Sequence, residues 1–151
     1  ADVRLIRRAR LAAGIVGWHL VRAARPSREV ALIAAAIVLG AVFETLLLQT
    51  GWVRFDTGVL LAGTAPYWMV ALWAIFATTL NVSLRALRPY PWMAAAFGAL
   101  GAPAAYYAGA NLGAMEFAAT GLALVAIGIG WAILTPALFG VARRLDGYTR
   151  T

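Results

Sequence analysis

FAATGLALVAIGIGWAILTPALFGVA, residues Phe117–Ala142, contains no charged residue, and Thr57–Leu84 and Pro89–Met115 are uncharged as well. Val30–Val53 is a fourth apolar run that only Glu44 interrupts. A helix that crosses a bilayer needs about 20 consecutive apolar residues at a rise of about 1.5 Å per residue. A soluble chain of 151 residues could not bury so many long apolar runs in one core. The sequence therefore predicts an integral membrane protein.

Composition and charge favour the same class of protein. The chain is 63% hydrophobic and only 13% charged, which is unusual for a soluble domain. All 13 basic residues are arginines in short clusters between apolar runs, the pattern of helical membrane proteins. The sequence shows no basic face with interleaved aromatic residues, so we do not expect nucleic acid binding. His19 is the only histidine and no cysteine is present, so we expect no metal site and no cofactor.

Helix breakers divide the chain into an arginine-rich N-terminal segment, residues 1–28, and a transmembrane helical bundle, residues 29–151. The expected spans cover residues 30–48, 66–84, 91–108 and 117–141. The apolar core of the first segment, Leu11–Val21, is too short to span without help, so an interfacial helix and a short span both remain open. The predicted fold class is all-α: a polytopic transmembrane bundle of four spans plus this N-terminal helix.

The distribution of arginine predicts the orientation. If residues 1–28 stay on one side, twelve arginines lie on one face and only Arg54 on the other; if Leu11–Val21 spans, the split is eight to five. Because cytoplasmic loops carry the excess of arginine, both arrangements place residues 22–28 and 85–90 in the cytoplasm. Both also predict a cytoplasmic C-terminus.

Two motifs, FATTLNVSL at Phe76–Leu84 and GALGAPAAYYAGANLGA at Gly98–Ala114, resemble an uncharacterised bacterial family of small multi-spanning membrane proteins, domain of unknown function 2878 (DUF2878). The resemblance extends over most of the chain. It implies a protein of the bacterial inner (cytoplasmic) membrane. It implies no activity, because none is established for the family.

Glu44 is the principal candidate functional residue. The helical rise places it roughly 21 Å from the cytoplasmic end of its helix. A charge there costs at least ~2.5–3.5 kcal/mol if it lies at the bilayer centre, and less near the interface. We therefore expect the carboxyl to face the bundle and be paired, or to be protonated by desolvation. Tyr106, Tyr107 and Asn111 are expected at the same depth and would complete a polar, outward-facing pocket. The carboxyl would relay protons, bind substrate or act as a general acid, or it would be a structural hydrogen-bond acceptor. The tyrosines would alternatively belong to an interfacial aromatic belt.

Other polar and small residues are expected to pack helices together. The polar set is His19, Asn81 and Ser83, of which Asn81 should bond across a helix interface. Small residues recur every fourth position on one predicted helix and beyond it: Gly101, Ala105, Gly109 and Gly113. Such a strip lets another backbone approach closely. We expect the contact to lie within the bundle, with a subunit interface as the alternative.

Two classes of function follow. The first is a non-catalytic membrane protein that binds lipids or partner helices, or a small subunit of a membrane assembly. The second is a membrane-embedded lipid-modifying enzyme, or a transporter of protons or small solutes, that uses Glu44. We favour the first class because no group of residues demands chemistry and no inverted repeat indicates a transporter. The expected partners are membrane lipids and other transmembrane helices.

Overall fold

The computed structural model describes residues 3–149, with side chains described from Arg10 onward. Helices dominate this part of the chain, and its longer elements are α1 Val3–Arg22, α2 Pro26–Gln49, α3 Tyr67–Leu80, α4 Pro91–Asn111 and α5 Thr120–Arg144. A short 3₁₀ helix, η1, covers Arg85–Leu87, and two strands of two residues each are β1 Val53–Arg54 and β2 Glu116–Phe117. The predicted all-α fold class is confirmed.

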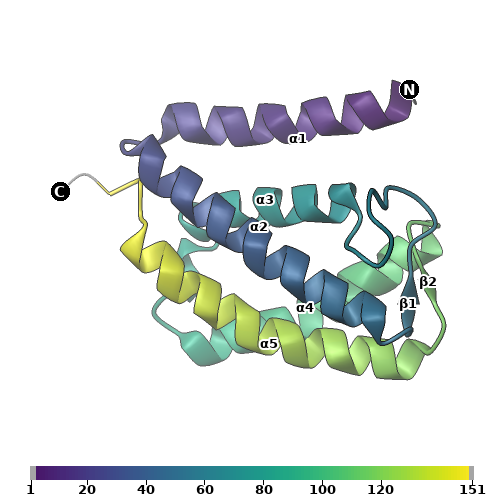
Figure 1. Ribbon diagram of the computed structural model, residues 1–151. Coiled ribbons are helices and arrows are strands. Elements are labelled where there is room, and N and C mark those ends of the chain that lie inside the picture. The colour runs from purple at the N-terminus through teal and green to yellow at the C-terminus, as the bar shows by residue number, and fades with distance from the viewer. Residues whose placement is uncertain (1–2, 150–151) are drawn as a thin grey trace.

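Successive helices run in opposite directions along the bundle (Figure 1). One end, which we call the strand end, carries β1 and β2. The other, which we call the arginine end, carries the α1–α2 turn, residues 81–90 and the last described residues of the chain. The α1–α2 and α4–α5 connections are short, so each second helix returns along its predecessor, whereas the longer segment 50–66 joins α2 to α3.

Two of the helices, α2 and α5, are long and apolar enough to cross a membrane, and α3 is a shorter apolar helix. The observed α2 and α4 contain the predicted ranges 30–48 and 91–108 and extend beyond them. At 14 residues, α3 is only about 21 Å long. The structure therefore supports helices at all four predicted positions, but only two of them have the length and hydropathy of a span.

The predicted helix 66–84 ends early, at Leu80. The hydroxyls of Thr78 and Thr79 donate hydrogen bonds to the backbone carbonyls of Ile75 and Phe76, at 2.7 and 2.6 Å. Such bonds compete with the regular backbone hydrogen bonds of the helix. The amide of Leu84 then closes a turn on the carbonyl of Thr79. Residues 81–84 form this turn and lead into η1.

The predicted helix 117–141 begins late, at Thr120. The reason is the antiparallel pairing of β1 with β2, which sets Val53 opposite Phe117 and Arg54 opposite Glu116. The amides of residues 118 and 119 continue this pairing to the carbonyl of Trp52. Strands of two residues leave no periodicity in a sequence, so this pairing was not predicted.

The closest helix packing joins α4 to α5 through a glycine. A Cβ atom on Gly98 would collide with the backbone carbonyl of Trp131 and the hydroxyl of Thr135. Ala94 and Ala102, one turn to either side of Gly98, are buried on the same face. Small residues on this line therefore let the two backbones meet.

The predicted strip of Gly101, Ala105, Gly109 and Gly113 lies on a different face. Gly101 and Ala105 are exposed, and a Cβ on Gly101 would meet no other atom within 4 Å. Gly113 lies beyond α4, in a turn that its positive φ of 74° favours. Gly101 and Ala105 therefore make no close contact inside the bundle, Gly109 is half-buried beside Met115, and the neighbouring line through Gly98 is the one that faces α5.

Helix α1 lies along α3 rather than across one end of the bundle (Figure 1). Val16 and Leu20 pack against the core, and His19 is buried beside them. The opposite face of α1 presents large apolar side chains: Leu11, Ile15, Trp18 and Val21. An exposed apolar stripe of this kind has no stabilising partner in water.

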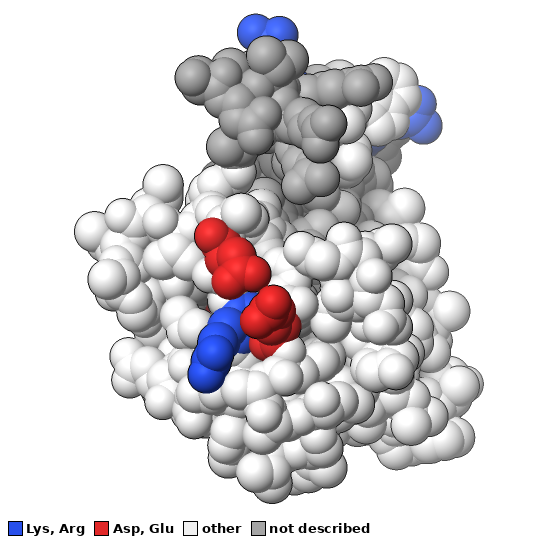
Figure 2. Space-filling model, turned by 90° about the vertical axis from the view of Figure 1, so that its right-hand side faces the viewer, with Lys and Arg blue, Asp and Glu red and all other residues white. Residues whose placement is uncertain are grey.

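The outer faces of the long helices are apolar in the same way. On α2, Val38, Val42 and Leu46 are each more than half exposed, and on α5 the same holds for Val125, Ile129 and Ile133. At the strand end, acidic and basic atoms gather in one place in the middle of the face, and further basic atoms lie at the upper edge of the view (Figure 2). The polar side chains Glu44 and Thr135 are fully buried inside the bundle.

We expect Gly98→Ala and Gly101→Ala to have opposite effects on stability. The first substitution places a methyl group against the Trp131 backbone and should cost about 1–3 kcal/mol of unfolding free energy. The second adds a methyl group in open space on the same helix and should gain about 0.5–1 kcal/mol. Thermal unfolding of the two purified variants in detergent measures both. Equal stability of the variants would refute the assignment of the α4–α5 contact to Gly98.

Candidate functional site

Glu44 is the centre of a buried polar group in the strand-end half of α2. Its carboxylate is fully buried, and its Oε1 atom accepts hydrogen bonds from the Trp73 indole at 3.0 Å and from the Tyr106 hydroxyl. The donors come from α3 and α4, so one carboxylate oxygen joins three helices. A charge or carboxyl group buried among apolar side chains requires such partners.

The second oxygen of Glu44 has no partner. Oε2 is buried without a hydrogen bond from any described residue, and the same is true of the Trp131 indole nitrogen and the Thr135 hydroxyl. Trp131 stacks on Trp73, with 4.4 Å between ring centroids, and so lies one ring away from the Glu44 group. The Glu44 group thus retains unused capacity to accept or donate hydrogen bonds.

A small groove reaches this group from the side of α4. It has a volume of about 210 Å³ and is lined by Tyr106, Trp131 and a floor of apolar or small residues: Phe76, Phe97, Gly98, Gly101, Ala102 and Ala105. The groove explains the exposed position of Gly101 and Ala105, whose missing or short side chains leave it open. It brings apolar surroundings to the hydroxyl that bonds Glu44.

Of the residues expected around Glu44, the structure brings only Tyr106 to it. Tyr107 is 51% exposed, and Asn111 is exposed as the last residue of α4. The difference is helical phase, because the residue after an inward-facing one points about 100° away. Trp73 was not expected here, although its indole is one of few donors on α3 able to reach a carboxylate.

A second buried carboxylate, Glu29, organises the arginine end. It is fully buried, and it accepts three hydrogen bonds at 2.8 Å: from His19 Nε2 on Oε2, and from Asn81 Nδ2 and the Gly147 amide on Oε1. These donors lie on α1, after α3 and after α5. A Cβ on Gly147 would collide with Glu29 itself and with the Arg25 carbonyl, so only glycine fits there.

His19 is hydrogen-bonded through both ring nitrogens and its backbone. Tyr148 donates its hydroxyl proton to the His19 carbonyl at 2.6 Å, and its oxygen lies 3.1 Å from His19 Nδ1. Nε2 lies 2.8 Å from the Glu29 carboxylate and donates to it. His19 therefore joins the C-terminal segment and α2 to α1.

Asp146 ties the end of the chain to η1. Its Oδ2 atom accepts from Arg85 at 3.0 Å and Arg88 at 2.8 Å, and its Oδ1 atom accepts from the amides of Tyr148 and Thr149. Burial alone would raise the pKa of Asp146, but the hydrogen bonds and the two arginine charges outweigh it and lower the pKa below its usual value. Residues 146–149, which we call the C-terminal clasp, are therefore bonded to α1, α2 and η1.

The three polar residues expected to pack helices behave differently. His19 and Asn81 meet at Glu29, whereas Ser83 is exposed in the turn after α3. Sequence reasoning missed Glu29, because an acid beside Arg28 at the start of a helix resembles an ordinary surface charge. The available signal was that the buried donors His19 and Asn81 lie at this end and need an acceptor, and Glu29 is an acid at that depth.

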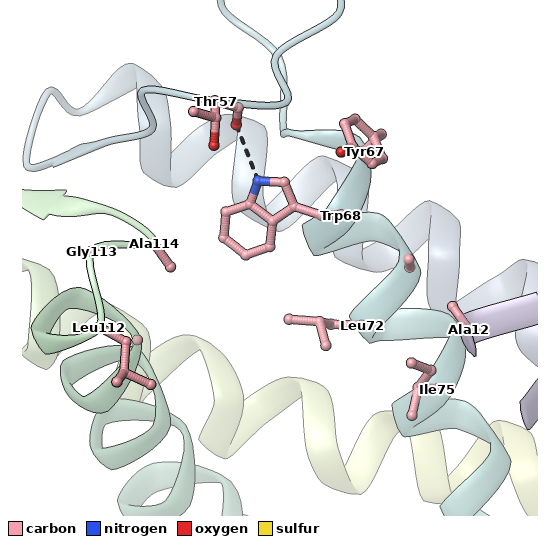
Figure 3. A pocket seen from close by; sticks show the side chains of 11 residues that line it. Ala12, Thr57, Tyr67, Trp68, Leu72, Ile75, Leu112, Gly113 and Ala114 are labelled. Carbon is pink, nitrogen blue, oxygen red and sulfur yellow. Dashed lines mark hydrogen bonds between the residues drawn. The ribbon is translucent and has the colours of Figure 1, made fainter. Parts of the chain in front are cut away.

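A larger cavity lies elsewhere, near the strand end between α1, α3 and α4. Its volume is about 540 Å³, and its lining is mostly apolar: Ala12, Thr57, Tyr67, Trp68, Ala71, Leu72, Ile75, Gly109, Leu112, Gly113 and Ala114. Figure 3 shows Trp68 and Leu72 of α3 facing Leu112 and Ala114 across it. The Trp68 indole donates to the Thr57 carbonyl at 3.1 Å and supplies one polar edge.

These groups limit the chemistry available. Among the residues that the structure describes, no three His, Asp or Glu side chains converge as metal ligands. Glu44 and Tyr106 form a carboxyl–phenol pair that is able to bind one further polar group, and the large cavity has the size of ordinary ligand pockets. The arrangement is suited to binding an apolar ligand that carries few polar atoms.

These features define the class of protein: it is an all-α helical bundle with apolar outer faces and carboxylates buried inside. Within that class, the family model described as "Protein of unknown function (DUF2878)" matches residues 3–137. The chain therefore belongs to this family, as the motifs at Phe76–Leu84 and Gly98–Ala114 indicated. No curated protein and no solved structure matches it.

We expect Glu44→Gln to fold and Glu44→Leu to be destabilised. Glutamine keeps a carbonyl oxygen for Trp73 and Tyr106 and should change the unfolding free energy by less than about 1 kcal/mol, whereas leucine leaves both donors buried without an acceptor and should cost about 2–4 kcal/mol. Thermal unfolding in detergent compares the two. A glutamine variant as unstable as the leucine variant would show that the charge itself is required.

Proposed function

We propose that the protein is a non-catalytic, lipid-binding protein of the bacterial inner membrane. In this proposal α2, α3, α4 and α5 are the four spans, and α1 crosses beside α3 as a short span. The large cavity between α1, α3 and α4 holds part of a lipid chain. The observation that carries the proposal is this cavity of about 540 Å³, apolar and enclosed by helices whose outer faces are also apolar.

The exposed apolar stripes on α1, α2 and α5 support insertion into the bilayer. Each stripe would cost free energy in water and costs none in lipid. The polar groups Glu44, Glu29 and Asn81 lie inside, with relative exposures of 0%, 0% and 1%, as expected where the surrounding solvent is hydrocarbon. Helix α3 alone is too short to cross the bilayer, and in this proposal the uncharged residues 57–66 before it cover the remaining thickness.

The position of α1 favours the short-span alternative. Ala12, near the beginning of the described side chains, lines the cavity close to the strand end, and His19 lies at the arginine end. The helix itself covers Val3–Arg22 and runs beside α3 from the strand end to the arginine end (Figure 1). This corresponds to the arrangement with eight arginines on the cytoplasmic side and five on the other, which still obeys the positive-inside rule.

A second candidate function rests on Glu44. Its unpartnered Oε2 atom and the groove that reaches Tyr106 favour a proton-relaying or lipid-modifying role. If Glu44 exchanges a proton, the Glu44→Gln protein will fold and accumulate but will lack function entirely. The exposed Gly101 and Ala105 leave one side of α4 flat, and a role in binding a partner helix stays a prediction.

The first test concerns topology. The chain has no cysteine, so single exposed positions can be labelled: Leu60 near the strand end, Ala86 at the arginine end and Arg10 on α1. In intact spheroplasts, an impermeant thiol reagent should label Leu60→Cys and Arg10→Cys, and it should label Ala86→Cys only after lysis. Labelling of Ala86→Cys in intact spheroplasts would reverse the orientation, and protection of Arg10→Cys would return α1 to the interfacial alternative.

The second test concerns the cavity. Gly109→Leu places a side chain into it, because Gly109 lines the cavity and a Cβ there meets only Met115 at 3.6 Å. Ala108→Leu makes the matched change at the adjacent exposed position, which does not line the cavity. Native mass spectrometry of gently extracted protein should show co-purifying lipid reduced about tenfold by Gly109→Leu and unchanged by Ala108→Leu, since about 1.4 kcal/mol corresponds to tenfold. Equal lipid retention by both variants would refute lipid binding in this cavity.

A further inference from the structure

At the arginine end, far from the large cavity, a hollow of about 350 Å³ lies between η1 and the last turn of α5. It is lined by Arg85, Arg88, Pro89 and Arg143. Nothing in the proposed binding of a lipid chain near the strand end uses these residues. The hollow brings together guanidinium groups from two segments that are more than fifty positions apart in the sequence.

The charges around the hollow are not balanced. Asp146 is the carboxylate that pairs with Arg85 and Arg88, and Arg143 forms no ion pair with any described residue and is exposed. The other acid at this end, Glu29, is buried and bonded to His19. Three guanidinium groups against one carboxylate leave an excess of positive charge that favours an anion.

The guanidinium groups of Arg85 and Arg88 are held in place before any ligand arrives. Each gives one N–H group to Asp146 Oδ2, and the amides of Tyr148 and Thr149 fix the other oxygen of that carboxylate. The side chain of Arg88 is only 12% exposed. A guanidinium carries five N–H donors, so each arginine keeps donors for a second acceptor, and phosphate oxygens match their planar geometry.

The neighbouring aromatic side chains indicate the depth of the hollow. Tyr90 and Trp92 lie one and three residues after Pro89 and are 51% and 70% exposed. Exposed tyrosine and tryptophan at the end of an apolar helix lie at the level of lipid headgroups. This position favours the headgroup of a lipid over an anion that is free in solution.

We propose that this hollow binds the phosphodiester headgroup of an anionic phospholipid. Arg143 provides the uncompensated charge, and Arg85 and Arg88, held by Asp146, direct their remaining N–H groups to the phosphate oxygens. The inference rests on the membrane insertion proposed above. It concerns a different site, because the large cavity would hold a chain near the strand end and this hollow would hold a headgroup at the arginine end.

The test compares two adjacent arginines. Arg143→Gln and Arg144→Gln remove the same charge from neighbouring exposed positions at the end of α5, but only Arg143 lines the hollow. The full chain is purified in detergent, and dioleoyl phosphatidylglycerol or dioleoyl phosphatidylcholine is titrated and followed by native mass spectrometry. We expect phosphatidylglycerol to bind the unchanged protein and Arg144→Gln with similar affinity. Arg143→Gln should bind it about tenfold more weakly, as expected for one lost charge-assisted hydrogen bond.

Three outcomes would overturn the proposal. Equal weakening by both substitutions would mean general attraction of anionic lipid to a basic surface. Equal binding of phosphatidylcholine would mean that net charge is not recognised. Complete displacement of phosphatidylglycerol by millimolar inorganic phosphate would assign the hollow to a free anion. Carbonate extraction of each variant distinguishes these three outcomes from a failure of membrane insertion. A protein that carbonate washes from the membrane would refute the membrane proposal as well.

Discussion

The burial of Glu29 is the constraint on which the arrangement at the arginine end depends. A carboxylate with no exposed surface loses its hydration, and the loss is offset only when every oxygen meets a donor in good geometry. Glu29 obtains its donors from α1, from the turn after α3 and from the C-terminal clasp. None of these segments can move away without leaving a buried oxygen of Glu29 short of a donor, so one side chain fixes the relative positions of four segments.

Glu44 presents the contrasting case. Its Oε1 atom is bonded twice, yet Oε2 is buried without a partner, whereas both oxygens of Glu29 are bonded. A structural carboxylate is stabilised by completing its hydrogen bonds, as Glu29 does. An incomplete one beside an open groove retains binding capacity, and this is why Glu44 remains the residue through which a catalytic or transport function would work.

Much of the fold could be predicted from the sequence, because uncharged runs and helix breakers mark helices directly. The errors lie where side chains act locally: Thr78 and Thr79 end α3 early, and the pairing at Glu116–Phe117 delays α5. The candidate site was predicted less well. Periodicity identifies small residues on one helix face but not which face meets a neighbour, so the sequence favours the strip through Gly101 although the line through Gly98 contacts α5. Hydrogen-bond partners such as Glu29 and Gly147 depend on contacts between distant segments, which no local pattern contains.

In a bilayer, apolar side chains gain little by leaving lipid for protein, so helix association depends on close packing and on polar contacts. The α4–α5 pair uses close packing at Gly98. Helix α1 has an apolar outer face and packs mainly along α3, so its position depends strongly on the polar bonds of His19 to Glu29 and Tyr148. Ala12 of the same helix forms one wall of the large cavity. The hydrogen bond between His19 and Glu29 at the arginine end therefore also holds the helix that closes the cavity near the strand end, and the two ends of the bundle are joined through α1.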